Sequence, residues 1–150
     1  MARALSLMLA LLVSLALSAP AFAAGPSVSV NILVIEAKRE KGDFDPRIVR
    51  LKDKITRAGY RSAVVLDELS HHQIEVGSRV SLQMPSRKQT LSVRVLEITK
   101  DQRIRLQVAI EGMKFETTTE HTNGGILLVG IPQKETKTAM MLGVTPTLEP

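Results

Sequence analysis

The stretch VSVNILVIEA, residues 28–37, has the length and composition of a β-strand that is buried on both faces. β-Branched residues recur along it, and four consecutive apolar residues, Ile32 to Ile35, occupy its middle. Because successive side chains of a strand point to opposite faces, this stretch needs apolar cover on two sides. We therefore expect it to lie at the centre of a sheet, between two layers.

A helix is predicted after this strand, over residues 46–58. Asp45 can accept a hydrogen bond from a free backbone N–H at the helix start, and Pro46 suits the first helical turn. Apolar residues recur at helical spacing and form one stripe, made of Ile48, Leu51, Ile55 and Ala58. Gly59 is typical of the residue that ends a helix. The stripe indicates that this helix packs on the sheet.

From Tyr60 onward, apolar residues recur at every second position, which is typical of strands with one buried and one solvent-exposed face. The alternating runs lie at 62–69, 80–84, 91–98, 104–110 and 113–120, followed by ILLVGI at 126–131 and TAMMLGV at 138–144. The alternation changes phase at Val95–Leu96, which indicates a β-bulge. The first of these runs is expected to return beside residues 28–37.

This order of elements predicts an α+β fold: a strand–helix–strand start followed by an antiparallel β-meander, with one helix packed on the sheet. Residues 24–145 are expected to form a single β-rich domain. Residues 146–150 carry two prolines and are expected to form a loose C-terminal tail.

The first 23 residues have the three parts of a cleavable secretory signal peptide. Arg3 precedes the apolar run 4–19, and Ala21-Phe22-Ala23 supplies the small-residue cleavage pattern. The alternative is a retained membrane anchor, but this run is short for a span of roughly 20 residues. We expect cleavage after Ala23 and a periplasmic product, or alternatively a secreted one, with no remaining transmembrane span.

Composition narrows the classes of partner. The chain has 20 Lys and Arg against 15 Asp and Glu, a formal net charge of +5, which predicts at most weak contact with an anionic membrane surface. It contains one Tyr, three Phe and no Trp, too few rings for the stacking on which single-stranded nucleic-acid sites depend. We therefore predict no nucleic-acid partner. The absence of cysteine excludes disulfides, thiol nucleophiles and Cys-based metal sites.

No catalytic pattern is found along the chain, which contains neither G-x-S-x-G nor H-E-x-x-H. We therefore predict that the protein is not an enzyme and holds no cofactor. The adjacent His71 and His72 suggest metal binding, but neighbours in an extended strand point to opposite faces. A metal-binding protein that uses His71 and His72 is the least favoured alternative, and a polar connector is the favoured interpretation.

Arginines recur on the wet faces of the expected strands. Arg94 and Arg105 belong to two strands expected to be neighbours, and Lys88 extends the same set. These three residues are candidates for an anion-binding face that would take an anionic ligand, lipid or glycan. Charged outer faces also keep sheets soluble and prevent them from associating with other sheets. This structural explanation is favoured over anion binding, because Glu97 and Asp101 dilute the positive charge.

HTNGGILLVG, residues 121–130, combines paired glycines with an apolar strand. A phosphate-binding loop needs a helix N-terminus and usually a spaced lysine, and neither follows these glycines. Asn123-Gly124 is typical of a tight hairpin turn. The apolar residues after the turn are candidates for a partner-binding strand or for an ordinary core strand, and they are Ile126, Leu127, Leu128 and Val129.

Three motifs together resemble those of short secreted or periplasmic proteins of Gram-negative bacteria that have no assigned activity. They are VNILVIEA at 30–37, DPR at 45–47 and NGGILLVG at 123–130. The last motif is also similar to the glycine-rich strand of outer-membrane secretins. The resemblance implies a periplasmic protein, accessory to an envelope-spanning machine for secretion, pili or gliding motility.

Together these observations predict a non-enzymatic periplasmic interaction domain, an accessory or structural component of a cell-envelope assembly. Its expected partner is another envelope protein. The alternative is binding of an anionic ligand, lipid or glycan through the basic sheet face.

Overall fold

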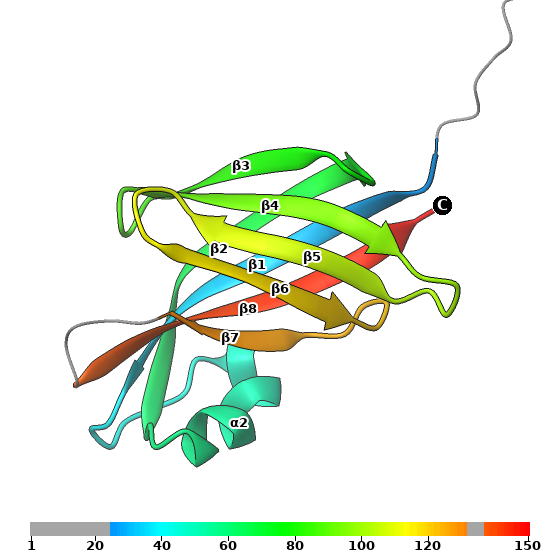
Figure 1. Ribbon diagram of the computed structural model, residues 1–150. Helices are drawn as coiled ribbons and strands as arrows, with labels where there is room; N and C mark the ends of the chain where they lie inside the picture. The colour runs from blue at the N-terminus through cyan, green and yellow to red at the C-terminus, as the bar shows by residue number, and fades with distance from the viewer. Residues whose placement is uncertain (1–24, 132–136) are drawn as a thin grey trace, which may run out of the picture.

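The computed structural model describes residues 25–131 and 137–150. Two four-stranded antiparallel sheets pack face to face, with one helical segment on the outside (Figure 1). The predicted signal peptide, residues 1–23, lies outside the described residues. Within those residues, no helix is long and apolar enough to cross a membrane.

The first sheet, called sheet A, has the strand order β2-β1-β8-β7. Its strands are β1 (Ser27–Lys38), β2 (Ser62–Glu75), β7 (Leu127–Ile131) and β8 (Thr138–Glu149). The expected central position of residues 28–37 is confirmed, because β1 pairs with β2 on one side and with β8 on the other. Val28, Val30, Ile32 and Val34 line the core between the sheets, and Leu33 and Ile35 face the helical segment.

The second sheet, called sheet B, has the order β3-β4-β5-β6. Its strands are β3 (Arg79–Met84), β4 (Gln89–Ile98), β5 (Ile104–Ile110) and β6 (Phe115–His121). Each strand pairs with the next, so the predicted meander is confirmed for this part of the chain. The predicted bulge is also confirmed, since the register between β4 and β5 shifts between Val95 and Glu97.

The predicted α+β fold class is wrong. Strands make up 61% of the structure, and the helical segment has 12 residues, so the protein is a β-rich sandwich. The alternating strands of sheet B bury their apolar faces against sheet A, where the sequence interpretation had placed one continuous meander beneath a helix. The helical segment covers only part of the outer face of sheet A, over Leu33 and Ile35.

That helical segment begins as expected but is not one regular α-helix. A 3-10 helix, η1 (Pro46–Leu51), leads into α2 (Lys52–Arg57), with non-helical backbone angles at Ile48. Asp45 is the N-cap, as predicted, and accepts a hydrogen bond from the backbone N–H of Arg47. The apolar stripe is buried at Ile48, Leu51 and Ile55, whereas Ala58 is exposed.

Residues 146–149, expected in a loose tail, instead continue β8 and pair with the beginning of β1. Pro146 is tolerated because its nitrogen and carbonyl point away from β1, beyond the end of β7. There the Pro146 carbonyl accepts a hydrogen bond from Gly124 N at 2.8 Å. A strand position that needs no N–H toward a neighbour accepts proline without loss of a ladder bond.

Asn123-Gly124 lies in a turn, but this turn does not form the expected hairpin. It carries the chain from β6 in sheet B to β7 in sheet A, which do not pair with one another. Gly124 has a φ of 73°, a conformation that glycine adopts without strain. The Asn123 side-chain oxygen accepts a hydrogen bond from Leu148 N, and this bond fastens the turn to the end of β8.

Candidate functional site

The four sheet edges are the places where an all-β domain can add a strand from another chain. β2 and β7 are the edges of sheet A, and β3 and β6 are the edges of sheet B. Their chemistry differs, and this difference defines the candidate site.

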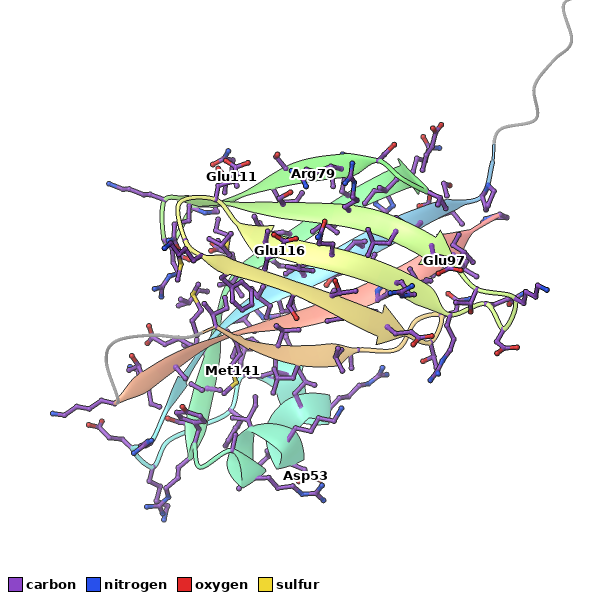
Figure 2. All side chains as sticks on the ribbon, in the orientation of Figure 1. Asp53, Arg79, Glu97, Glu111, Glu116 and Met141 are labelled. Atoms are coloured by element: carbon purple, nitrogen blue, oxygen red, sulfur yellow. The ribbon has the colours of Figure 1, made fainter. Side chains whose placement is uncertain are left out.

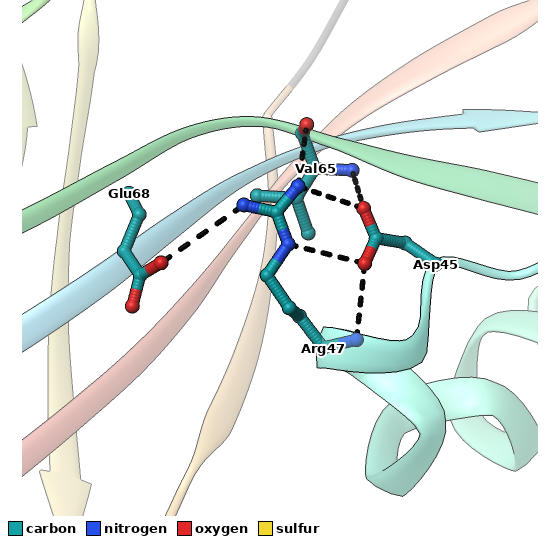
Figure 3. A network of polar contacts seen from close by, with 4 residues as sticks. All are labelled: Asp45, Arg47, Val65 and Glu68. Atoms are coloured by element: carbon teal, nitrogen blue, oxygen red, sulfur yellow. Dashed lines mark hydrogen bonds and ion pairs between the residues drawn. The ribbon is translucent and has the colours of Figure 1, made fainter.

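The beginning of the β2 edge, at Ala63 and Val65, is covered by the segment just before the helix, and Figure 3 shows the contact at Val65. Asp45 N donates a hydrogen bond to the Ala63 carbonyl oxygen, and Ala63 N donates one to the Asp43 carbonyl oxygen. The next edge residue, Val65, donates its N–H to Asp45 Oδ2 at 3.3 Å, and its carbonyl accepts from Arg47 Nη2 at 3.5 Å. The side chains of Asp45 and Arg47 thus continue the edge pairing that the backbone begins.

Asp45 and Arg47 form a two-point ion pair that fixes this closure. The Asp45 carboxylate accepts from Arg47 Nε at 3.1 Å and from Arg47 Nη2 at 2.9 Å. These side-chain bonds, together with the bond from the Arg47 backbone N–H, hold the pKa of Asp45 well below its ordinary value. Arg47 also lies 3.9 Å from Glu68, so it connects the helix start to β2.

The edges of sheet B carry charge. β6 presents Glu116 and Glu120 on its outward-facing side, and β3 presents Arg79. If two copies of β6 paired antiparallel about Thr118, each Glu116 would lie opposite a Glu120, which disfavours self-pairing. Charged residues at sheet edges oppose strand addition.

The remaining edge, β7, is uncharged. We call the side of β7 that faces away from β8 the β7 edge; the strand there reads LLVGI. Its register with β8 is continuous, without a bulge. Gly130 is exposed, and a Cβ at this position would meet no atom within 4 Å. Among the edges described, this one lacks both a charged residue and a covering segment.

The candidate residues Ile126, Leu127, Leu128 and Val129 all lie at this edge, but their side chains are used within the chain. Leu127 and Val129 line the core between the sheets, and Ile126 and Leu128 pack on the cluster beneath the helical segment. The protein's own helix therefore covers the outer side of this strand. What remains available to a partner is the backbone of β7 and not its side chains.

His121, at the end of β6, is a buried polar group beside the β7 edge. Only 3% of the residue is exposed, and its Nε2 lies 2.6 Å from Thr119 Oγ1. Its Nδ1 is buried without a hydrogen bond of good geometry. Burial lowers the pKa of His121, and the nearby Gly125 backbone opposes this effect only in part. His121, Gly125 and Leu127 line a surface cavity of about 180 Å³.

The candidate anion-binding residues are not brought together as a set. Arg94 lies on the outer face of sheet B, the face turned away from the core, opposite Gln107 of β5. Arg105 lies on the same face, paired with Glu97 at 3.1 Å. Lys88 lies in the turn between β3 and β4, six positions before Arg94 along the chain. Arg94 and Arg105 are diagonal neighbours, and Lys88 is remote from both.

Sequence reasoning missed Arg79, which lies directly opposite Arg94 across β3 and β4. Figure 2 labels it on β3, the edge strand of sheet B. The alternation of residues 79–84 placed Arg79 on the wet face, and the length of the turn after Met84 sets the hairpin register. Together these two signals could have identified the pair.

His71 and His72 lie near the irregular end of β2. His71 Nδ1 is 2.9 Å from the carbonyl oxygen of His72, and His72 Nδ1 is 3.1 Å from the Glu149 carboxylate. Partial burial opposes ionisation of Glu149, but hydrogen bonds from His72 and the Gln73 backbone outweigh it and lower the Glu149 pKa. Among the described residues, no group of three His, Asp or Glu could hold a metal ion.

A comparison with protein-family models, curated proteins and solved structures finds no match to this chain.

Proposed function

We propose that this protein is a non-enzymatic interaction domain of the bacterial periplasm that accepts a β-strand of another envelope protein along the β7 edge. The main observation behind this proposal is that β7 is an uncharged edge, while β2, the opposite edge of the same sheet, carries charged residues and is covered at Val65 by Asp45 and Arg47. In strand addition, backbone hydrogen bonds supply the affinity, and alternating side chains supply the specificity. The periplasmic location follows from the signal peptide predicted from the sequence.

The surroundings of β7 define the chemistry of the strand it would accept. On the core side, Leu127, Val129 and Ile131 end an apolar layer that a partner side chain would extend. On the other side, Leu128 lies against the cluster beneath the helical segment. An accepted strand is therefore expected to be apolar on both faces and free of charge over about five residues, the length of β7.

An accessory role in a secretion, pilus or motility machine is the part of this proposal that rests on resemblance. A domain of this kind would attach to a larger envelope protein by accepting one of that protein's strands beside β7. The absence of a catalytic sequence pattern agrees with a binding role.

Affinity capture from crosslinked cells tests the proposal. Wild-type protein is expected to recover an envelope protein, and Gly130→Lys is expected to lose it, because a charge on an edge strand opposes pairing. Gly130 is a suitable position, since an added Cβ there meets no atom within 4 Å. Thr118→Lys on β6 is the matched control, which places the same charge on an edge of the other sheet and should retain the partner.

Two outcomes would contradict the proposal. One is recovery of the same envelope protein by wild-type and Gly130→Lys baits in equal amounts. The other is a dimer in light scattering that Gly130→Lys disrupts, because a second copy would then occupy the β7 edge.

A further inference from the structure

Two arginines lie opposite one another on the outer face of sheet B, with no carboxylate partner among the described residues. The register pairs Arg79 of β3 directly with Arg94 of β4. On the same side of the molecule, Arg105 lies 3.1 Å from Glu97, and Arg103 lies 4.0 Å from Glu120. Among the residues that the structure describes, no carboxylate lies within 4.0 Å of Arg79 or Arg94.

The register places the two arginines directly opposite one another. Residues directly opposite in an antiparallel pair have Cβ atoms roughly 4.5–5.5 Å apart, and like charges in this arrangement repel. Arg94 Nε donates to the carbonyl oxygen of Gly77 at 3.3 Å. Gly77 lies two residues before Arg79, so this bond holds the Arg94 guanidinium beside the beginning of β3. An anion that contacted both side chains would relieve their repulsion.

A cavity of about 390 Å³ opens beside Arg79. Arg79 lines one side of it, and its floor is formed by Ser92 and Ala109, which lie opposite each other across β4 and β5. These small side chains leave the space that larger residues on the same face would fill. Glu116 follows in the same cross-strand row, opposite Ala109 (Figure 2).

The far side of the cavity carries both signs of charge. Lys114 lies there together with Glu111 and Glu116. Glu116 also accepts a hydrogen bond from the Gln107 side chain. This side therefore favours hydroxyl groups, which can donate and accept hydrogen bonds, over a second anionic group.

We propose that Arg79 and Arg94 bind the phosphate group of a small hydroxylated phosphate monoester, whose remaining atoms occupy the cavity over Ser92 and Ala109. A phosphate monoester carries a charge between about −1.5 and −2 at neutral pH, which matches two guanidinium groups better than the single charge of a carboxylate. The planar guanidinium also binds phosphate oxygens through two parallel hydrogen bonds. This site lies on sheet B and is independent of the β7 edge.

Calorimetry with glucose 6-phosphate at constant ionic strength tests the site. Wild-type protein is expected to bind this probe, to bind inorganic phosphate more weakly and to bind neither glucose nor acetate. Arg79→Gln and Arg94→Gln are each expected to weaken binding at least about tenfold, the usual effect of losing a hydrogen bond between charged groups. Arg105→Gln is the matched control, because Arg105 has Glu97 as its partner, and it should change binding less than about twofold.

Folding of the variants is verified independently. Without ligand, Arg94→Gln is expected to unfold at the same temperature as the wild type or higher, because it removes a like-charge contact. Arg79→Lys, which keeps the charge and loses the two-point geometry, should bind with intermediate affinity.

Three results would overturn the proposal. The first is equal binding of glucose 6-phosphate by the wild type and by Arg79→Gln with Arg94→Gln. The second is equal weakening by Arg105→Gln, which would indicate general electrostatic attraction. The third is binding to phosphatidylglycerol vesicles without binding to glucose 6-phosphate, which would assign the arginines to a membrane surface.

Discussion

The Asp45 side chain makes three structural contacts. Its carboxylate caps η1, pairs with Arg47 and accepts the N–H of Val65, so it joins the helix start to the edge of β2. The first role follows from the Asp-Pro sequence, since the N-cap bond is local. The contact with Val65 joins residues that lie far apart in the chain, so it depends on where β2 returns.

Replacing Asp45 is predicted to destabilise both the helix start and its contact with β2. Asp45→Ala should lower the midpoint of thermal unfolding, because Arg47 N and Val65 N both lose their acceptor. Asp45→Asn keeps an N-cap acceptor without the charge, so its unfolding midpoint should lie between those of the wild type and Asp45→Ala. Asp53→Ala, on the exposed side of α2, is the control (Figure 2). Equal midpoints for the Asp45→Ala and Asp53→Ala variants would contradict this account.

His121 is predicted to make the fold sensitive to acid. Burial lowers its pKa in the folded protein from the ordinary value of 6.5, so the unfolded chain binds a proton at higher pH than the folded one. The free energy of unfolding should therefore be constant above about pH 7 and decrease as the pH falls below 6.5. The contribution of this single group cannot exceed about 1.4 kcal/mol per pH unit.

Urea unfolding between pH 7.5 and pH 5 measures this effect. His121→Gln should remove the acid-dependent part of the loss, whereas His71→Gln on β2 should leave it in place. A pH profile that is identical in the wild type and in His121→Gln would show that burial of this histidine has no energetic consequence.

At the scale of elements, the helical segment and β8 illustrate what local pattern can predict. The apolar stripe at Ile48, Leu51 and Ile55 was visible at helical spacing, and all three residues are buried. The split into η1 and α2 was not visible, because it depends on how Ile48 meets the sheet. Similarly, β8 extends to Glu149 because β1 offers a partner over its whole length.

Contact between the helical segment and β8 is predicted to require glycine at position 143. A Cβ on Gly143 would lie 3.3 Å from Leu51 Cδ1 and 3.4 Å from Ile126 Cδ1, both in tight packing. Gly143→Ala should therefore destabilise the protein by about 1 kcal/mol or more in urea unfolding. Gly130→Ala, where a Cβ meets nothing within 4 Å, should be neutral or stabilise by up to about 1 kcal/mol. The opposite order would contradict the packing described.

At the scale of the whole molecule, the two sheets arise from a division of the chain that the sequence does not mark. β3 to β6 form one sheet in chain order, whereas β7 and β8 return to the sheet begun by β1 and β2. This return brings the end of β8 beside the start of β1. It also leaves β7 as an edge, so the proposed β7 site depends on it, whereas the pairing of Arg79 with Arg94 is set by the β3–β4 hairpin.

The end of the chain is therefore predicted to contribute to global stability. Deletion of residues 146–150 removes the pairing of β8 with Ser27 to Val30 and the acceptor of Gly124 N. It should cost at least about 1.5 kcal/mol, the contribution of one buried apolar side chain, because Leu148 packs on the core. Deletion of Pro150 alone should have no effect. Hydrogen exchange and urea unfolding would measure the loss; equal stability of the two truncations would favour a loose tail.

The sequence by itself determined the properties that depend on near neighbours in the chain. These are the doubly buried strand at 28–37, the Asp45 cap, the meander from β3 to β6 and the bulge at Val95, each of which is visible as a change in local period or turn chemistry. The sequence analysis selected Arg94 and Arg105 by alternation but not Arg79, because its position opposite Arg94 depends on the register of the β3–β4 hairpin.

Only the tertiary structure decided which strands share a sheet, and with it the fold class. An alternating strand must bury one face, but its sequence does not say whether a helix or another sheet covers that face. The same uncertainty applied to Ile126 to Val129, whose apolar side chains are covered by this chain's own layers, so that only the backbone edge of β7 stays open. The apolar pattern shows which side chains must be buried, and the path of the whole chain determines which layer covers them.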